Sequence, residues 1–194
     1  MEKLFVATSN AHKLEEIGNI LKMFNIEREL VCPKTFNDLD EPVEDGKTFE
    51  DNALIKARYW FNKYKIPTIA DDSGITIKFF NNFPGIYSAR FMKDSSYYVK
   101  NSWILQGMEG ESERAAAFHC VIAYITESEE KTFEGILNGE IAKSISGENG
   151  FGYDPIFFLP ELNKTTSDLS PEEKNRLSHR SLALQKWGEY VKYK

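Results

Sequence analysis

Two adjacent carboxylates at the end of an apolar run are the residues of this sequence best suited to chemistry. Residues 68–70 are mostly apolar, Asp71 and Asp72 follow them, residues 73–74 are Ser-Gly, and a second, alternating apolar run occupies residues 75–79. This pattern predicts a strand, a break and a second strand, with the carboxylates at the break.

Asp71 and Asp72 are not expected to act as a side-by-side pair, because successive side chains of an extended chain point to opposite faces. We expect one to face a ligand and the other to point away. Carboxylates beside so much apolar sequence are costly unless they are compensated. A divalent cation such as Mg²⁺ would compensate them, since it prefers oxygen ligands. A polar turn with solvated aspartates explains the same residues equally well.

A second group of candidate residues lies where a strand is expected to lead into a helix. Residues 4–7 predict a short buried strand, residues 8–10 (Thr-Ser-Asn) are all N-cap types, and apolar residues then recur at helical spacing. A helix amino-terminus at the carboxyl end of a strand is a ready anion site. Lys13 in the first turn opposes the helix dipole. A bound phosphate would offset its charge, and so would Glu15 and Glu16.

Other helices are expected to carry cations near their starts. A capping box opens a helix at Thr48, and Lys56 lies close to its apolar face. Ser170 opens another, with proline at the first helical position and Lys174 in the first turn. A last helix is expected over residues 178–190, beginning with Ser-His-Arg.

Several intervening segments predict loops and strands. Residues 33–47 form an acidic loop that is solvated or supplies one metal ligand, with Glu44 as a candidate. Residues 115–125 predict a buried strand in which His119 is a satisfied core histidine. Residues 133–141 predict another strand, broken by its two glycines.

A glycine-rich loop with two aromatics occupies residues 147–155. Its glycines would let the backbone approach a ligand, and a rigid ring such as that of Phe151 offers a face on which a base can stack. A surface turn with core aromatics is the alternative.

Composition limits the function classes. The 194 residues are 41% hydrophobic and 28% charged, which is ordinary for one globular domain or two lobes sharing a sheet. The net charge of −6 argues against nucleic acid as a partner. Cys32 and Cys120 have no metal or redox spacing, and Cys120 is expected to be a buried, inert thiol. We find no signal peptide or membrane span, and expect a cytoplasmic protein that does not contact membranes.

Five segments, spread over nearly the whole chain, resemble the inosine triphosphate pyrophosphatase family. The segments are Thr8-Ser9-Asn10 with Lys13, Asp51-Asn52-Ala53 with Lys56, Asp71-Asp72-Ser73-Gly74, Phe151-Gly152-Tyr153-Asp154-Pro155, and Ser178-His179-Arg180. The family usually has glycine at the position of Ser9. The resemblance implies an α/β fold over residues 1–194: an elongated, twisted, mixed β-sheet flanked by helices, with two lobes around a central nucleotide-binding cleft. It also implies a homodimer.

The resemblance further implies roles for single residues. Asp72 would be the catalytic carboxylate, binding Mg²⁺ or activating water, with Glu44 as a second, weaker metal candidate. The residues contacting the phosphates and the reacting centre would be Thr8, Ser9, Asn10, Lys13, Lys56 and Ser73. The residues forming the base and sugar pocket would be Phe151, Gly152, Tyr153 and Asp154. The residues reaching the base edge would be Lys174, His179 and Arg180.

The implied activity is hydrolysis of ITP, dITP and XTP to the nucleoside monophosphate and pyrophosphate, which removes them before polymerases incorporate them. His179 and Arg180 are the candidates to donate to the 6-keto group that distinguishes these bases from adenine, and Arg180 is always a donor. A pyrophosphatase for modified pyrimidine nucleotides is one alternative, opposed by the Ser-His-Arg segment and the aromatic loop. A nucleotide-sensing module without turnover is another, opposed by Asp72 and the three matching lysines.

Overall fold

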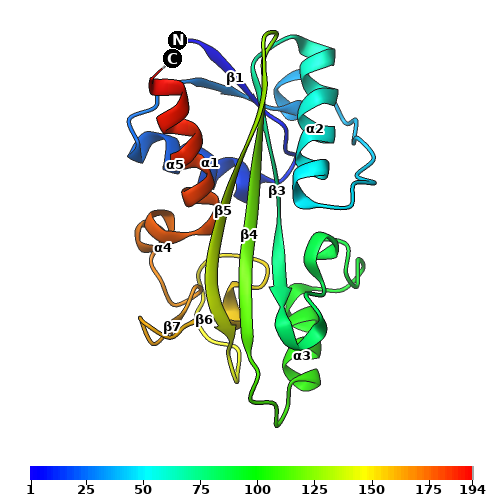
Figure 1. Cartoon of the computed structure of the whole chain (residues 1–194), viewed down its shortest axis with the longest axis vertical. Coiled ribbons are helices and arrows are strands. Elements are labelled where there is room, and N and C mark those ends of the chain that lie inside the picture. The colour runs from blue at the N-terminus through cyan, green and yellow to red at the C-terminus, as the bar shows by residue number, and fades with distance from the viewer. Residues whose placement is uncertain (194) are drawn as a thin grey trace. The chain divides into compact units, whose positions relative to one another are not determined.

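The protein is described by a computed structural model that covers residues 1–193 (Figure 1). Seven strands form one mixed sheet in the order β2-β1-β3-β4-β5-β6-β7. The strands are β1 (Lys3–Val6), β2 (Glu29–Val31), β3 (Thr68–Ile77), β4 (Ala115–Ile125), β5 (Glu130–Ile141), β6 (Phe157–Leu159) and β7 (Lys164–Thr165). The helices are α1 (Ala11–Met23), α2 (Phe49–Tyr64), α3 (Tyr97–Gly107), α4 (Pro171–Leu177) and α5 (His179–Lys192).

The sheet is mixed because its two ends pair differently. Strand β1 runs parallel to both β2 and β3, whereas β6 runs antiparallel to both β5 and β7. Helices flank this sheet, so the expected fold class is confirmed. Across residues 1–193, no helix is both long and apolar enough to cross a membrane.

The chain divides into two compact units. Unit 1 contains Met1–Ser73, Cys120–Gly135 and the residues from His179 onward. Unit 2 contains Gly74–His119 and Ile136–Ser178. Each unit therefore consists of segments that are far apart in the sequence.

Unit 1 buries side chains on both faces of its strands. Leu4 and Val6 of β1 pack with α1 and α5, whereas the intervening Phe5 and the following Ala7 pack with α2. This alternation follows from the two-residue period of a strand. Helices α1 and α5 thus cover one face of β1 and β3, and α2 covers the other (Figure 1).

Unit 2 has a core of its own. Ile75 and Ile77 of β3 pack with Ile104 and Met108, from α3 and its carboxyl end, and with Phe157 of β6. All five of these side chains are at most 1% exposed. This core supports the glycine-rich loop that precedes β6.

The helix boundaries follow the capping residues expected from the sequence. The side chain of Asn10 caps α1, and capping boxes open α2 at Thr48 and α4 at Ser170. The strand expected over residues 115–125 has these bounds in β4.

The two expected strand breaks are wrong. Strand β3 continues through Asp71 and Asp72, because both carboxylates are buried with cationic partners and do not need a solvated turn. Strand β5 also continues through its glycines. A Cβ at Gly135 would lie 2.1 Å from the backbone oxygen of His179, and one at Gly139 would lie 2.6 Å from that of Phe158. These glycines permit close packing and do not interrupt the strand.

Candidate active site

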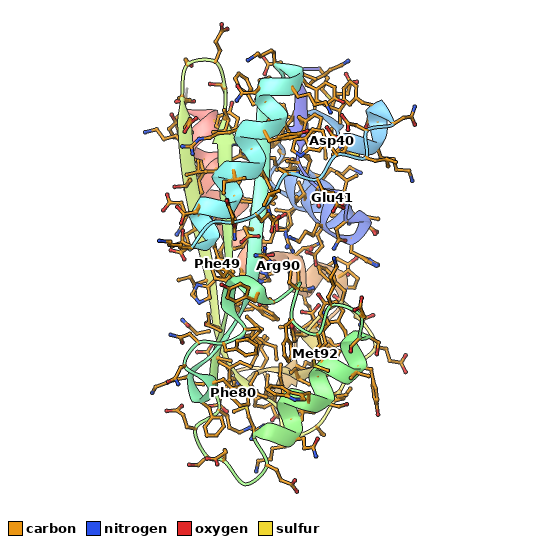
Figure 2. All side chains as sticks on the ribbon, turned by 90° about the vertical axis from the view of Figure 1, so that its right-hand side faces the viewer. Asp40, Glu41, Phe49, Phe80, Arg90 and Met92 are labelled. Carbon is orange, nitrogen blue, oxygen red and sulfur yellow. The ribbon has the colours of Figure 1, made fainter. Side chains whose placement is uncertain are left out.

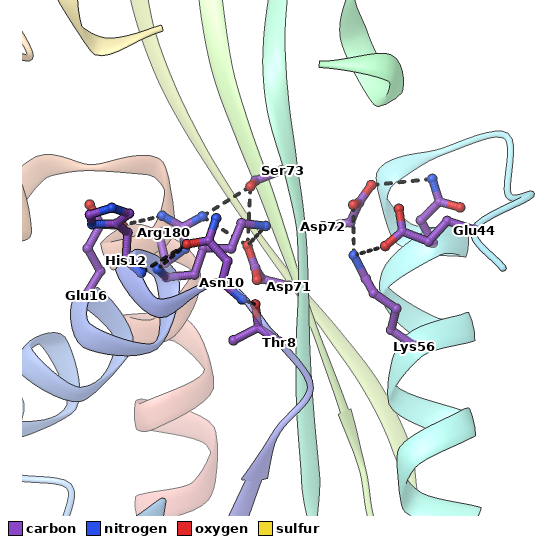
Figure 3. Close-up of polar contacts among 12 residues, drawn as sticks. Thr8, Asn10, His12, Glu16, Glu44, Lys56, Asp71, Asp72, Ser73 and Arg180 are labelled. Atoms are coloured by element: carbon purple, nitrogen blue, oxygen red, sulfur yellow. Dashed lines mark hydrogen bonds and ion pairs between the residues drawn. The ribbon is translucent and has the colours of Figure 1, made fainter. Parts of the chain in front are cut away.

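Asp71 and Asp72 point to opposite sides of β3, as expected for neighbours on a strand (Figure 3). Asp71 lies on the side of α1 and α5, whereas Asp72 lies on the side of α2, where it contacts Lys56. The two carboxylates therefore belong to two separate polar clusters within unit 1.

Asp71 holds two cations from different helices. The Nζ atom of Lys13 lies 2.9 Å from Asp71 Oδ2, and the guanidinium of Arg180 lies 3.0 Å from the same oxygen. The Ser73 hydroxyl donates to Asp71 at 3.2 Å and accepts from Arg180 at 3.1 Å. A further ion pair joins Arg180 to Glu16 of α1.

Burial and charge act in opposite directions on this cluster. Burial alone would raise the pKa of Asp71, but the charges of Lys13 and Arg180 outweigh burial and hold its pKa well below the usual value. Arg180 is 2% exposed, and nearby carboxylates raise its pKa despite the cost of burial. Asp71 and Arg180 are therefore both charged, and they tie α5 to β3.

The second cluster contains two carboxylates that share one ammonium. Lys56 Nζ lies 3.0 Å from Asp72 Oδ1 and 2.8 Å from Glu44 Oε1. The side-chain amide of Asn52 donates to the other oxygen of Asp72 at 3.4 Å. Glu44 comes from the acidic loop, Asp72 from β3 and Lys56 from α2 (Figure 3). Asn52 lies one turn before Lys56 on the same helix.

The environment of Asp72 differs from that of Asp71. Burial raises the pKa of Asp72, and the single ammonium of Lys56, shared with Glu44, only partly opposes that effect. Burial also disfavours the charge of Lys56, but the carboxylates of Asp72, Asp71 and Glu44 outweigh it and raise the pKa of Lys56. Asp72 is thus the carboxylate that gains a proton more readily.

The acidic loop is fastened to α2 at both ends. At its start, Asp38 and Asp40 each form an ion pair with Lys63, and Figure 2 shows Asp40 and Glu41 on the segment that runs alongside α2. At its end, the backbone N–H of Gly46 donates to Asn52 Oδ1 at 2.9 Å. These contacts fix the part of the loop that carries Glu44.

The amino end of α1 is already capped by side chains. Asn10 Oδ1 accepts hydrogen bonds from the backbone N–H groups of His12 and Lys13 at 3.0 and 3.3 Å. Thr8 Oγ1 accepts from the backbone N–H of Asn10 at 3.2 Å, and Ser9 is exposed. An anion at this end would therefore meet side-chain groups in addition to the helix dipole.

A divalent metal fits the second cluster by the chemistry of its donors. Glu44 and Asp72 direct oxygen atoms at one cation, which in this structure is the ammonium of Lys56. Within residues 1–193, no group of three or more acidic, histidine or cysteine side chains is arranged to hold a metal. Two carboxylates suit Mg²⁺, which usually keeps several waters and substrate phosphates as its remaining ligands.

In unit 2, the glycine-rich loop places a cation over an aromatic ring. Lys174 Nζ lies 4.8 Å from the ring centroid of Phe151 and 2.7 Å from Asp154 Oδ2. The same oxygen of Asp154 accepts the backbone N–H of Phe151 at 2.7 Å. Gly150 and Gly152 have φ values of +77° and +70°, which favour glycine.

Of the two aromatics in this loop, Tyr153 belongs to the core. It is 4% exposed, and its hydroxyl donates to the backbone oxygen of Ser88 at 2.7 Å. Phe151 is half-buried. Asn101 of α3 donates to the backbone oxygen of Gly152 at 3.1 Å and thereby helps to hold the loop in place.

Of the remaining residues, His179 was an expected site residue, whereas His119 and Cys120 were expected to belong to the core. His179 is buried at the first position of α5. His119 is half-buried and lies 3.1 Å from the Thr76 hydroxyl, which agrees with a satisfied core histidine. Burial raises the pKa of the Cys120 thiol to about 12, which agrees with an inert thiol.

Sequence reasoning assigned no role to Asn52, although its position one turn before Lys56 was the available signal. It is fully buried between the acidic loop and Asp72.

Comparison with known proteins identifies the family. The sequence profile of the Ham1 family matches residues 4–190. The chain belongs to the Ham1 family. It is 41% identical to the dITP/XTP pyrophosphatase of Caldanaerobacter subterraneus subsp. tengcongensis over 98% of this chain and 96% of that protein. It is also 41% identical to the dITP/XTP pyrophosphatase of Vibrio parahaemolyticus, over 95% and 94% of the two chains.

Solved structures agree with this assignment. The Ham1 protein of Coxiella burnetii superposes with a TM-score of 0.90, at 36% identity and over 100% of both chains. The Ham1 protein of Staphylococcus aureus has a TM-score of 0.87, at 34% identity and over 98% of both chains. These structural matches cover nearly the whole chain and confirm the family resemblance noted in the sequence.

Proposed function

We propose that this Ham1 protein hydrolyses ITP, dITP and XTP to the nucleoside monophosphate and pyrophosphate, and so removes these nucleotides from the pool. The proposal draws on the names of its relatives, which are dITP/XTP pyrophosphatases. The observation that carries it is the convergence of Asp72 and Glu44 on Lys56, which places a buried carboxylate beside a fixed positive charge.

Phosphate binding is assigned to the amino end of α1. Thr8, Ser9 and Asn10 offer polar side chains there, while Lys13 brings a positive charge already held in place by Asp71. The side-chain oxygen of Asn10 caps the helix, so the side-chain NH₂ group of Asn10 is the part that would donate to phosphate. Lys56 would add a positive charge to this phosphate site, and Ser73 would add a hydroxyl group.

Asp72 is assigned the role of general base. Burial raises the pKa of Asp72, which makes its carboxylate a better proton acceptor than an ordinary aspartate. Water activated by Asp72 would attack the α-phosphorus, the bond to the β-phosphate would break, and pyrophosphate would leave. Asp72 and Glu44 would also hold Mg²⁺, whose charge would stabilise the developing negative charge on the phosphate oxygens.

The family resemblance assigns the base to the glycine-rich loop and to three donors at the base edge. Phe151 would stack on the purine, and Gly152, Tyr153 and Asp154 would shape the pocket around the base and sugar. Lys174, His179 and Arg180 are the proposed donors to the base edge. Since Arg180 is bound to Asp71 and Glu16 in this structure, its part in base selection needs a test separate from its structural part.

One assay tests the proposal directly. The protein is incubated with ITP, dITP, XTP, ATP, GTP and a modified pyrimidine triphosphate, with and without Mg²⁺, and pyrophosphate and orthophosphate are measured separately. We expect Mg²⁺-dependent pyrophosphate release from the first three and little from ATP. Orthophosphate as the only inorganic product would refute the proposal, and binding without turnover would identify a sensor.

The proposal includes a cytoplasmic homodimer. The family resemblance supports the homodimer. The two cysteines support the cytoplasmic location, because they are buried and not joined in a disulfide in the described part of the chain. Light scattering on the purified protein would measure its mass, and a monomer at micromolar concentration would refute the dimer.

A further inference from the structure

Asn52 is a fully buried amide that contacts Asp72 and also the acidic loop, which carries Glu44. Its relative exposure is 0%, although it is only the fourth residue of α2. One end of its side chain contacts the backbone of the acidic loop at Gly46, and the other end contacts Asp72. A buried polar group is costly unless it is hydrogen-bonded, so both contacts matter for the fold.

The orientation of this amide follows from its neighbours. The backbone N–H of Gly46 can only donate, so it must face the Asn52 carbonyl oxygen, 2.9 Å away. The amide nitrogen then faces Asp72 Oδ2 at 3.4 Å and donates to it. The other oxygen of Asp72 accepts from Lys56. The two oxygens of Asp72 therefore have different partners.

We propose that Asn52 is a positioning residue that sets where the acidic loop presents Glu44 relative to Asp72. The inference rests on the proposed function. An amide suits the position because it accepts from the loop and donates to a carboxylate with no charge of its own. An aspartate there would still accept from Gly46, but it could not donate to Asp72 and would repel it.

Gly46 supplies independent support, because the loop touches α2 with no room for a side chain. A Cβ at Gly46 would lie 2.5 Å from Asp51 Cβ, 2.7 Å from Asn52 Oδ1 and 2.9 Å from the Asn52 backbone nitrogen. These atoms belong to the first turn of a capped helix and cannot move away easily. Gly46→Ala should therefore displace the loop, and Glu44 with it, without altering Asp72 or Lys56.

The first experiment compares Asn52→Ser with Asn62→Ser, a substitution at an exposed position on the same helix, as control. Calorimetry measures Mg²⁺ affinity without nucleotide, and kinetics separate kcat from KM. Loss of a group that orients metal ligands typically lowers affinity or activity 10–100-fold. We expect a loss of that size in Mg²⁺ affinity and kcat for Asn52→Ser, which removes the amide and adds no charge, and no change for the control. An unchanged Mg²⁺ affinity and kcat in folded Asn52→Ser would overturn the inference.

The second experiment remains informative if Asn52→Ser does not fold. Gly46→Ala, Glu44→Gln and the double variant form a cycle. If the loop acts through Glu44, the double variant should bind Mg²⁺ no more weakly than Glu44→Gln alone, whereas additive losses would overturn the inference. The wild-type nucleotide assay tests the proposed function separately, because metal affinity in these variants does not depend on which nucleotide is cleaved.

Discussion

Asp71 and Asp72 show how neighbouring residues of one type acquire different tasks. Asp72 shares one ammonium with Glu44, and burial raises its pKa, whereas Asp71 is bound to two cations that lower its own. We predict that Asp72→Asn folds normally but loses turnover by about 10²–10⁴-fold, the usual loss when one acid–base or electrostatic group is removed. Steady-state kinetics with ITP and circular dichroism measure the two effects. Near-normal turnover would remove Asp72 from the chemistry.

Asp71→Asn is expected to act mainly on stability. Removing one partner from a buried ion pair typically costs about 3–5 kcal/mol, because the remaining charge is left uncompensated. For a chain of this length that corresponds to a fall in Tm of roughly 6–20 °C. Scanning calorimetry measures the fall, and kcat at a temperature well below Tm should drop less than in Asp72→Asn. If the two variants exchanged ranks in kcat, the roles assigned to the two faces of β3 would be reversed.

Arg180 forms buried ion pairs and is also a proposed donor to the base, and one variant can separate these two tasks. We predict that Arg180→Ala lowers kcat/KM for ITP about tenfold more than for ATP. An unpaired buried donor opposite adenine costs roughly 1–3 kcal/mol, and the variant no longer has that donor. Because Arg180 also binds Asp71 and Glu16, the variant should be less stable, and both nucleotides are measured well below its Tm. An equal fall for both would assign Arg180 to structure alone.

At the scale of elements, helix starts were predictable and the role of strand glycines was not. Capping depends on residues three positions apart, so Asn10, Thr48 and Ser170 indicate it in the sequence itself. A glycine's role in a strand depends on what packs against it. At Gly135 that is the first turn of α5, more than forty residues further along the chain.

Gly135→Ala is therefore expected to destabilise the protein. The added Cβ would overlap two backbone atoms, His179 O at 2.1 Å and Ala183 N at 2.5 Å, so α5 would have to shift. Overpacking typically costs about 1–3 kcal/mol, and a fall in Tm measures it. Gly18→Ala is the matched control: its nearest neighbour would be 3.7 Å away, and alanine favours a helix, so Tm should hold or rise. Equal Tm values for both variants would contradict the packing argument.

The acidic loop should respond to pH through Asp38. Hydrogen bonds from Lys63 and Tyr64 lower the pKa of Asp38 from 3.8 to about 2. A carboxylate with a lowered folded-state pKa contributes stability above its unfolded pKa, and that contribution is lost as the pH falls toward the folded value. The Tm of Asp38→Asn should therefore lie below that of the wild type at pH 6, and the gap should narrow from pH 4 to pH 2.5. A gap independent of pH would mean that the charge of Asp38 is not what fastens the loop.

At the scale of the whole molecule, the sequence located the candidate residues but not their partners. The five segments that indicated the family each contain their own signal within a few residues. The ion pair between Asp71 and Arg180 joins residues 109 positions apart, and neither residue's surroundings in the sequence indicate the other. Arg180 was therefore expected to face a ligand, while the structure places it between Asp71 and Glu16.

The segmented composition of unit 1 has a consequence for synthesis on the ribosome. Its core joins Leu4 and Val6 to Ala183, Leu184 and Trp187 of α5, which are translated much later. Until α5 leaves the exit tunnel, the apolar faces of β1 and α1 lack their cover, whereas every strand and helix of unit 2 has already been translated. Nascent chains should therefore gain protease resistance in unit 2 first, and unit 1 should close only after α5 has emerged.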